Sequence, residues 1–483
     1  MTGLPEAFCS RMRGLLGEEY EAFIESYGQE PAKGLRLNRL KQAKEGTDWE
    51  AWAQALAAET GFSLERVPWA RDGFYYQGSD RPGKHPYHEA GVYYIQEPSA
   101  MAVVELLDPQ PGERVLDLCA APGGKTSHIA SRLGGKGLLV SNEPHPSRAK
   151  ILSQNVERMG MGGCVVVSHE PHELEEHFAD FFDRIAVDAP CSGEGMFRKE
   201  EQAAGQWSPE QVAACARRQQ EILDSASRML RAGGRLVYST CTFAPEENEG
   251  TVRQFLETHP QFQVEEVQGR PGLSSGCPQW LGLSEDRLNL RATFRIFPHK
   301  ARGEGHYIAV LKKMEGPKAG GKAQPGEYLD LKGQKGLLLD YRQFLKENLE
   351  DPDLFLDRRE YVMFGSQLYL MPPELPPIKG LKVLRPGLHM GTLKKNRFEP
   401  SHALALYLKP EAVKRSLVLD PKEELAVRYL KGETLTEDKS RWPRLSGQKG
   451  WVLVCIGPYS LGWAKLAGGV FKNHYPKGLR RLG

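Results

Sequence analysis

Val115-Leu116-Asp117-Leu118-Cys119-Ala120-Ala121-Pro122-Gly123-Gly124-Lys125-Thr126 is the stretch that decides the fold. An apolar run ends in a loop of small residues, and a helical pattern follows the loop. Small residues let a backbone approach a bound molecule closely, and the free N–H groups of such a loop can meet its polar groups. The stretch therefore predicts the first strand, loop and helix of a nucleotide-binding α/β unit.

Strand and helix patterns alternate around this unit, from residue 96 to residue 313. Strands are predicted at 114–118, 136–141, 163–167, 183–187 and 235–239, and a hairpin is predicted from 292–297 and 306–311. A long helix is expected at 209–230. Such alternation is typical of a mainly parallel sheet covered by helices. We therefore assign residues 96–313 to one α/β domain.

At 483 residues the chain is too long for one ordinary domain. Residues 1–95 mix helical and strand patterns and predict a small α+β region. Residues 314–327 are rich in Gly, Pro, Lys and Ala and predict a linker. A small middle domain at 328–400 and a final domain at 401–483 are expected to follow it.

Composition narrows the class of protein. The eight cysteines are scattered without a CxxC pair, and the 13 histidines show no metal-ligand spacing, so no disulfide scaffold and no metal are expected. No apolar run approaches the ~20 residues that a membrane helix needs. The first residues also lack a signal-peptide layout. We expect a cytoplasmic protein that does not bind a membrane.

The net charge of +2 hides an asymmetry. Residues 379–483 hold 21 Lys and Arg against eight Asp and Glu, a balance of +13. A partner with a phosphate backbone would select such a basic quarter, although a solubilising surface gives the same balance. The basic loop at 81–86 lies beside Tyr87, Tyr93 and Tyr94, which suits single-stranded RNA or, equally, a closed domain junction.

Polar and sulfur side chains follow three of the predicted strands. Glu143 follows 136–141, where an acid can accept both ribose hydroxyls of an adenosyl cofactor. Asp188 and Cys191 follow 183–187, and Cys241 follows 235–239. Because the carboxyl ends of parallel strands share one crevice, we expect Cys191 and Cys241 to meet near the cofactor. Two cysteines and an aspartate at such a cleft indicate covalent catalysis by a thiolate.

Three motifs carry a resemblance to a known family, namely the stretch at 117–126, Asp188-Ala189-Pro190-Cys191-Ser192 and Tyr238-Ser239-Thr240-Cys241. Together they resemble the RNA (cytosine-5) methyltransferases of the Sun/nucleolar-protein family, as do residues 35–38 and 94–99. Residues 365–369 and 388–394 make the extension similar to the bacterial RsmF (YebU) subgroup. The resemblance implies a Rossmann-like class I methyltransferase domain between a small N-terminal α+β domain and two small C-terminal domains, the last a PUA-like RNA-binding domain.

The resemblance also implies individual roles. The implied cofactor is S-adenosylmethionine, held by Cys119, Ala120, Ala121, Pro122, Gly123, Gly124, Lys125, Glu143, Arg148, Glu170 and Asp188. Cys241 corresponds to the nucleophile, Cys191 to a second cysteine that helps to release the product, and Asp188 to a group that also touches the target base. The implied substrate is 16S ribosomal RNA, in its decoding region, either free or in the small ribosomal subunit. The protein is expected to be a monomer.

These residue types fit methyl transfer to C5 of cytosine. C5 is a poor nucleophile, and a thiolate that adds to C6 makes it enolate-like. Asp188, protonated or sharing a proton, can bond the N3 edge of the base and spread the developing charge. A helix predicted to begin with Pro245 in its first turn would help Cys241 to ionise, whereas the acids at 246, 247 and 249 would oppose it.

Other functions stay open at this point. A DNA cytosine-5 methyltransferase would use Cys191 of the Pro190-Cys191 pair as nucleophile, but Cys241 would then be unexplained. A methyltransferase that acts on tRNA or another RNA is a further alternative. A non-catalytic ribosome-assembly RNA binder that retains the fold is another. His306 follows Gly305 in a strand pattern, and we expect a structural role for it.

Overall fold

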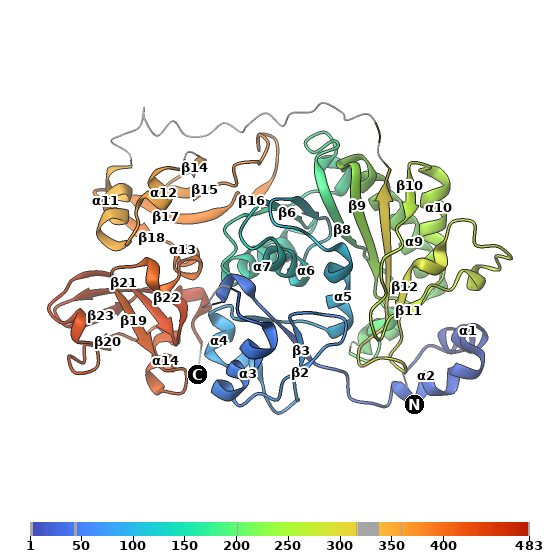
Figure 1. Ribbon diagram of the computed structural model, residues 1–483, viewed down its shortest axis with the longest axis horizontal. Helices are drawn as coiled ribbons and strands as arrows, with labels where there is room; N and C mark the ends of the chain where they lie inside the picture. Colours follow the sequence, from blue (N-terminus) through green and yellow to red (C-terminus); the bar gives the residue numbers. More distant parts are fainter. Residues whose placement is uncertain are drawn as a thin grey trace.

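The computed structural model describes residues 3–42, 46–199, 201–314, 316, 338–358 and 360–481. The strands of these residues form one ten-stranded sheet in the centre, a four-stranded sheet near the N-terminus, and sheets of four and five strands in the C-terminal part (Figure 1). The linker predicted at 314–327 lies outside the described residues, apart from Met314 and Gly316.

Five parallel strands form the middle of the central sheet, in the order β9-β8-β5-β6-β7. They are β5 (Arg114–Asp117), β6 (Leu138–Asn142), β7 (Cys164–Val167), β8 (Phe182–Asp188) and β9 (Leu230–Thr240). On the β9 side follow β13 (His306–Lys313), β12 (Phe294–Ile296) and β11 (Ser274–Ser275), all antiparallel, and β10 (Phe262–Val264) also pairs with β13. The predicted mainly parallel sheet and its terminal antiparallel pair are therefore confirmed.

Helices cover both faces of this sheet (Figure 1). On one face α5 (Pro98–Leu107), α6 (Gly124–Leu133) and α7 (Pro146–Arg158) share a core with Val115, and on the other α9 (Pro209–Met229) and α10 (Glu249–Thr258) share a core with Leu116. Successive strand residues point to opposite faces, so the continuous apolar run of β5 supplies both cores. The doubly covered sheet leaves the carboxyl ends of its strands free to build a site.

The helix after Cys241 begins later than the sequence predicts. Residues 245–248 form a turn, and α10 starts at Glu249. The reason is tertiary, because the buried Glu247 carboxylate accepts a hydrogen bond from the Ser192 N–H group at 3.0 Å. The dipole of a helix acts mainly within its first turn. Cys241 lies eight residues before this helix, beyond the first turn in which the dipole acts.

One edge of the central sheet comes from the C-terminal part of the chain. β16 (Val383–Arg385) pairs antiparallel with β7, although the sequence places it inside the middle domain. The Arg385 guanidinium lies 2.5 Å from the Glu157 carboxylate of α7. The Lys382 N–H group donates to His169 Nε2 at 2.7 Å. These contacts fix the C-terminal part to the end of β7, beside the predicted cofactor site.

The N-terminal region packs in two separate places. α1 (Glu6–Leu16) and α2 (Tyr20–Ser26) share an aromatic core with residues of the α/β domain, including Phe197 and Phe243. The four-stranded sheet, in the order β2-β3-β1-β4, lies away from these helices (Figure 1). Its strands are β1 (Gly34–Leu37), β2 (Glu65–Arg66), β3 (Gly73–Tyr75) and β4 (Tyr93–Ile95), flanked by α3 (Trp49–Thr60) and α4 (Pro86–Glu89).

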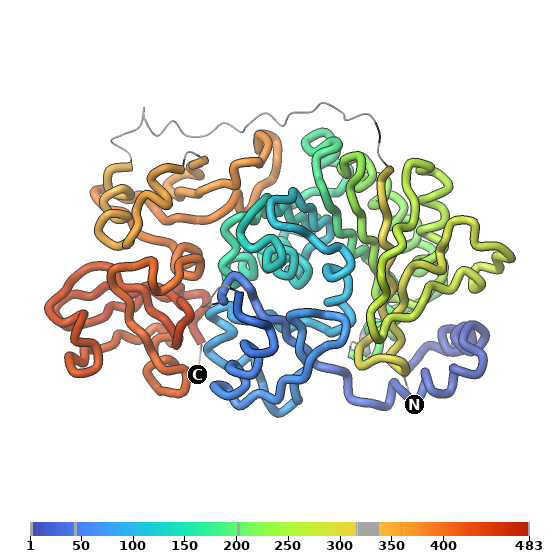
Figure 2. Tube along the Cα trace, viewed as in Figure 1, coloured from blue at the N-terminus to red at the C-terminus, as the bar shows by residue number. Residues whose placement is uncertain are grey.

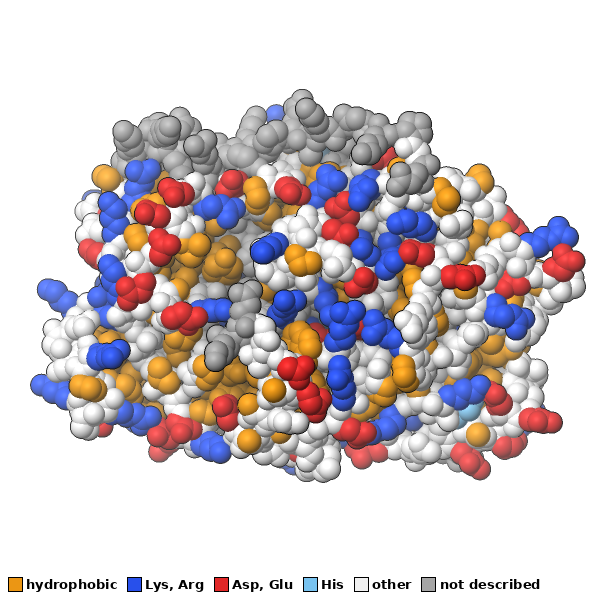
Figure 3. All heavy atoms as spheres, in the orientation of Figure 1, with side chains coloured by type: hydrophobic (Ala, Val, Ile, Leu, Met, Phe, Trp, Pro, Cys, Tyr) orange, Lys and Arg blue, Asp and Glu red, His pale blue; other side chains and the backbone are white. Residues whose placement is uncertain are grey.

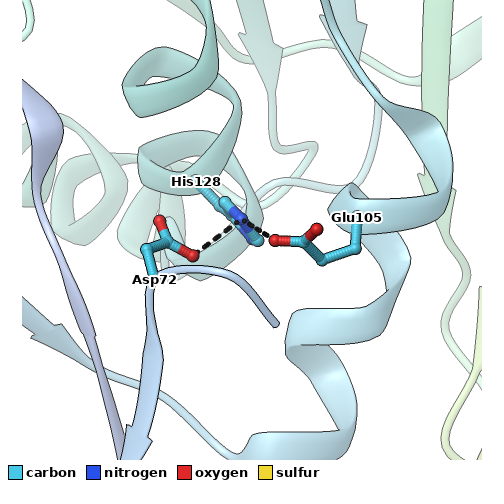
Figure 4. Close-up of side chains that lie close together, drawn as sticks. All are labelled: Asp72, Glu105 and His128. Atoms are coloured by element: carbon cyan, nitrogen blue, oxygen red, sulfur yellow. Dashed lines mark ion pairs between the residues drawn. The ribbon is translucent and has the colours of Figure 1, made fainter. Parts of the chain in front are cut away.

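A buried charge cluster joins this sheet to α5 and α6 (Figure 4). His128 Nε2 lies 3.4 Å from the Asp72 carboxylate and 3.5 Å from the Glu105 carboxylate. Such a trio has the residue types and spacing of a metal site. However, Arg36 pairs with Asp72 and Arg132 with Glu105, and these guanidinium groups already neutralise the two acids. A metal cation would be repelled there, so we assign the cluster a structural role.

The C-terminal part forms two small domains (Figure 2). One holds α11 (Leu339–Asn348), α12 (Asp353–Leu356), α13 (His402–Tyr407) and a sheet of β14 (Tyr361–Phe364), β15 (Gln367–Leu370), β17 (Leu388–Lys394) and β18 (Arg397–Pro400). The other holds α14 (Glu424–Leu430) and a sheet in the order β19-β21-β22-β23-β20. Its strands are β19 (Ser416–Leu419), β20 (Leu435–Thr436), β21 (Gly450–Ile456), β22 (Tyr459–Ala467) and β23 (Val470–Asn473).

The tyrosines beside the basic loop close a domain junction. Tyr87 and Tyr93 are buried, and the Tyr87 ring lies 5.0 Å from the Tyr459 ring of the last domain. The two regions share one apolar core. The alternative that these tyrosines stack on RNA is therefore wrong. Across the described part of the chain, no helix combines the length and the apolar character needed to cross a membrane.

Candidate active site

Two cysteine side chains meet at the carboxyl ends of β8 and β9. These strands are parallel neighbours with Asp188 opposite Ser239, so the loops that follow them leave the sheet side by side. Cys191 Sγ lies 3.2 Å from Cys241 Sγ, and the Cys241 N–H group donates to Cys191 Sγ at 3.3 Å. Both residues are half-buried, and both thiols are free. Residues 50 positions apart in the sequence are thus in direct contact.

The two cysteines line a cavity of about 490 Å³. Cavities of this size commonly hold small molecules. Eight residues predicted for the site lie together in its wall: Cys119, Ala121, Lys125, Glu143, Arg148, Asp188, Cys191 and Cys241. Ala120, Pro122, Gly123 and Gly124 belong to the same loop but are not in the wall. The wall is completed by residues from further segments, among them Glu97, Pro171, Arg218 and His306.

Gly123 of this loop has a backbone conformation and a packing position that favour glycine. Gly123 has a φ of +112°, a conformation that favours glycine. A Cβ atom there would lie 3.2 Å from Leu152 Cδ1 of α7. Asn155 of the same helix donates to the Pro122 carbonyl oxygen at 2.8 Å. The glycine therefore lets the loop turn tightly into α6 while resting on α7, and the loop's shape follows from this packing.

Lys125 and Asp188 form an ion pair in the cavity wall. Lys125 Nζ donates to Asp188 Oδ2 at 2.6 Å, and Ser239 Oγ donates to Asp188 Oδ1 at 2.8 Å. Burial alone would raise the pKa of Asp188, but Lys125 and His306 outweigh it and the pKa is lowered. Of the two expected forms of Asp188, protonated or sharing a proton, the ion pair with Lys125 favours the second. The proton at this point is the one that Lys125 shares with the carboxylate.

Glu143 presents a buried carboxylate to the same cavity. Its side chain is 2 % exposed, and it accepts a hydrogen bond from the His145 N–H group at 3.1 Å. Arg148 lies 3.3 Å from the carboxylate and also donates to the Ala121 carbonyl oxygen at 3.0 Å. Arg148 thus connects Glu143 to the glycine loop. A carboxylate held in this way is a suitable acceptor for a pair of hydroxyl groups.

Glu170, the acid predicted after β7, is placed differently. It is exposed and lies outside the cavity wall, whereas the next residue, Pro171, lies in the wall. The Glu170 N–H group donates to the Glu173 carboxylate at 3.0 Å, in a short helical turn that starts at Pro171. The structure therefore does not bring Glu170 together with the other predicted residues.

His306 is a wall residue that the sequence did not identify, since its Gly-His context in a strand carries no chemical signal. It begins β13, whose pairing with β9 places Tyr307 opposite Thr240. Its position beside Cys241 therefore depends on tertiary pairing. Burial and, to a smaller extent, the charge of Lys125 lower the pKa of His306 to about 4, so the imidazole is neutral at neutral pH. Its Nε2 atom is buried and makes no hydrogen bond to the described residues.

The Cys191 thiol keeps its proton. Its hydrogen bond with Cys241 and its burial both raise the pKa of Cys191 well above the ordinary value. Burial raises the pKa of the Cys119 thiol as well. Cys191 is thus a neutral S–H group that faces the sulfur atom of Cys241.

Residues 104–312 match the family model described as 16S rRNA methyltransferase RsmB/F. Together with the Rossmann-like sheet and the cavity at its carboxyl edge, this match defines the α/β domain as a methyltransferase domain. The flanking segments match the N-terminal domain of 16S rRNA methyltransferase RsmF (4–98), the RsmF rRNA methyltransferase first C-terminal domain (343–408) and the methyltransferase RsmF PUA domain (416–481).

Curated relatives match almost the whole chain. Ribosomal RNA small subunit methyltransferase F of Salmonella paratyphi B and that of Salmonella typhi are each 31 % identical over 492 residues, which cover 99 % of this chain and 97 % of the relative. A crystal structure of a methyltransferase homologue from Pyrococcus horikoshii is 27 % identical, with a TM-score of 0.55 over 65 % of this chain and 96 % of that one. The chain belongs to the RsmB/F family of 16S rRNA methyltransferases.

Proposed function

We propose that this protein transfers a methyl group from S-adenosylmethionine to C5 of a cytosine in 16S ribosomal RNA, through a covalent bond between Cys241 and C6 of the base. The observation that carries the proposal is the contact of two free thiols, 3.2 Å apart, in the wall of a cavity that also holds Asp188 and Lys125. A methyltransferase acting on an amine or a hydroxyl group needs no such pair, because those atoms are nucleophiles themselves.

The residues of the cavity fit the methyl donor. The buried Glu143 carboxylate suits the two ribose hydroxyls of an adenosyl group, and Pro144 and Pro171 supply apolar walls beside it. Cys119, Ala121 and Lys125 line the same cavity as Glu143, Asp188 and the two cysteines. When bound, S-adenosylmethionine supplies an electrophilic methyl group. Glu170 is exposed and lies outside the cavity wall, and the proposal assigns it no contact with the donor.

Cys241 starts the reaction as a thiolate that adds to C6 of the cytosine. Addition places negative charge on the ring, at C5 and at the N3 edge. The Lys125–Asp188 pair holds a proton in the cavity wall, and sharing this proton with N3 neutralises the developing charge. C5 then takes the methyl group and displaces the donor's sulfur atom, which keeps the electrons of the broken S–C bond. The role of the pair is therefore to make a poor carbon nucleophile reactive.

Release of the product needs the second thiol. The C5 proton is lost to water, its bonding electrons form the C5=C6 double bond, and the C6–S bond breaks with its electrons on Cys241. Cys191, which keeps its proton, presents an S–H group to this departing sulfur atom. A hydrogen bond from a neutral donor stabilises the thiolate as it leaves. The target base itself must be unpaired or flipped out of a helix to reach the cavity.

The C-terminal domains supply the RNA affinity in this proposal. Residues 379–483 carry a balance of +13, and residues 416–481 match an RsmF PUA domain. Figure 3 shows Lys and Arg side chains over this part of one face and over the centre of the molecule, with Asp and Glu among them. The names of the curated relatives indicate RNA of the small subunit as the substrate. Such an enzyme would act in the cytoplasm as a monomer.

Two measurements test the proposal. Purified protein, S-adenosylmethionine with a labelled methyl group and small-subunit RNA should give labelled RNA, and bisulfite sequencing should place 5-methylcytosine in 16S RNA only in cells that carry the gene. Label in tRNA but not in 16S RNA would contradict the substrate. Label in 16S RNA that is not 5-methylcytosine would contradict the chemistry, and tight RNA binding without any transfer would indicate a non-catalytic binder.

A further inference from the structure

A buried carboxyl group lies behind the two cysteine loops, in the turn between β9 and α10. Glu247 is fully buried, and its side chain points toward the catalytic loops rather than toward solvent. Buried acids that lack a cationic partner are uncommon unless several hydrogen bonds hold them. The hydrogen bonds that hold Glu247 therefore indicate its role.

Glu247 holds the loop of the first cysteine. Its Oε2 atom accepts a hydrogen bond from the Ser192 N–H group at 3.0 Å, and its Oε1 atom accepts one from the Ser192 hydroxyl group. Gln219 Nε2, on α9, donates to Glu247 Oε2 at 2.8 Å and to the Pro190 carbonyl oxygen at 3.0 Å. Pro190 and Ser192 flank Cys191. The carboxylate and the amide thus fix the backbone on both sides of that thiol.

The same group reaches the loop of the second cysteine. Ser192 Oγ lies 2.9 Å from Thr242 Oγ1, and Thr242 follows Cys241 directly. The Tyr238 hydroxyl group, on β9, donates to the Glu247 carbonyl oxygen at 2.6 Å. One residue therefore connects the strand that precedes Cys241, the residue that follows it and the loop of Cys191. No other described carboxylate makes hydrogen bonds to Ser192.

We propose that Glu247 is a positioning residue that holds the Cys191 thiol against Cys241, and that it acts in the release of methylated RNA. The inference rests on the proposed function, since it concerns the step in which the C6–S bond breaks and Cys241 leaves as a thiolate. Glu247 itself touches neither the base nor the methyl donor. Without it, Cys191 is free to move away from the departing sulfur atom, while Cys241 and the cavity beside Lys125 remain.

Three variants test this role, with the full-length protein, small-subunit RNA and S-adenosylmethionine carrying a labelled methyl group. Glu247→Ala should slow release of methylated RNA by about tenfold, and a covalent RNA–protein adduct that carries the label should accumulate on denaturing gels. Glu247→Gln keeps the size of the side chain and an acceptor for the Ser192 N–H group, and should restore most of the release. Ser192→Ala removes only the hydroxyl link and should trap adduct in smaller amount.

Glu249→Gln is the matched control. Glu249 is a buried acid two residues away, but it pairs with Arg295 and does not contact either cysteine loop. Glu249→Gln should lower the melting temperature without trapping adduct, which is the result expected of a residue with a merely structural role. If Glu247→Ala does not fold, Ser192→Ala carries the test. Folded Glu247 or Ser192 variants that release RNA at the wild-type rate, with no adduct, would overturn the proposal.

Cys191→Ala separates this inference from the proposed function. That variant should trap labelled adduct whatever the role of Glu247. If Cys191→Ala traps adduct and the Glu247 and Ser192 variants do not, only the positioning role of Glu247 is lost. If no variant and no wild-type protein forms an adduct or transfers a methyl group, the proposed function itself is overturned.

Discussion

Lys125 Nζ lies 2.6 Å from Asp188 Oδ2, and this ion pair joins the glycine loop after β5 to the end of β8. The loop side of the pair belongs to the predicted donor site, and the strand side leads into the loop of Cys191. Both side chains are largely shielded, with 10 % and 31 % of their surface exposed. In the proposed function the pair therefore couples the place of the methyl donor to the place of the target base.

Replacing Lys125 by Met should lower kcat/KM for methyl transfer by roughly 10- to 100-fold at pH 7, the range for loss of a hydrogen bond to a charged group. Lys125 is the main cation that lowers the pKa of Asp188, so the pKa of Asp188 rises in the variant. The acid limb of the pH profile of kcat/KM should therefore move to higher pH. An unchanged acid limb, measured from pH 5 to 9, would show that Asp188 does not need this cation.

Asp117 should make stability depend on pH. It is fully buried, its Oδ2 atom accepts a 2.6 Å hydrogen bond from Thr126, and burial raises its pKa to about 7. An unfolded aspartate has a pKa near ~3.9, so the group favours the folded state below that pH, and this contribution is lost as the pH rises through 7. The difference amounts to on the order of 4 kcal/mol at about 1.4 kcal/mol per pKa unit.

Asp117→Asn keeps the acceptor for Thr126 and removes this dependence. The melting temperature of the variant relative to wild type should therefore rise between pH 4 and pH 8. Thermal unfolding followed by circular dichroism across this range is the measurement. A difference in melting temperature that stays constant with pH would mean that Asp117 is ionised in the folded protein throughout.

Gly123→Ala should weaken binding of S-adenosylmethionine. A φ of +112° is strained for alanine by roughly 1–2 kcal/mol, and the new methyl group would press on Leu152, so the loop must shift. Gly134→Ala is the control, because Gly134 also has a positive φ, of +59°, but ends α6 in open space. Both should lower the melting temperature, whereas calorimetry should find weaker binding for Gly123→Ala alone. Equal affinities of the two variants for S-adenosylmethionine would show that the loop is not part of the donor site.

The last domain should contribute phosphate contacts. Lys465 and Lys472 are exposed, lie opposite each other on β22 and β23, and Lys465 lies 5.6 Å from the Trp451 ring. Replacing both lysines by alanine should weaken RNA binding several-fold and reduce the slope of log Kd against log salt by about 1–2. Lys136→Ala, in the exposed turn before β6, should leave the slope unchanged. Filter binding at several salt concentrations distinguishes these outcomes.

Local sequence patterns were sufficient to predict the strands in the middle of the central sheet but not the strand β16 at its edge. The apolar runs at β5 to β9 are long and bounded by turns, and the carboxyl ends of parallel strands must converge, so the meeting of Cys191 and Cys241 could be predicted. β16 is three residues long and lies between proline-rich turns. Its pairing with β7 depends on contacts such as Arg385 with Glu157, which no local pattern encodes.

Three differences between the predicted and the observed surroundings of the site have similar causes. Glu170 follows β7 as the pattern requires, but it lies exposed at the start of the turn that begins at Pro171. The acids after Pro245 read as a helix start, whereas burial of Glu247 against Ser192 delays the helix. His306 enters the cavity only because β13 pairs with β9. In each case a tertiary contact determines where the residue lies, and a single sequence does not contain that information.

The contact between Cys191 and Cys241 is the centre of the account, and one measurement tests it most directly. Cys191→Ala and Cys241→Ala variants are incubated with small-subunit RNA and labelled S-adenosylmethionine, and covalent RNA–protein adducts are separated on denaturing gels. Cys191→Ala should accumulate a labelled adduct, and Cys241→Ala should form no adduct and no methylated RNA. Adduct formation by Cys241→Ala, or full activity of that variant, would contradict the assignment of Cys241 as the nucleophile.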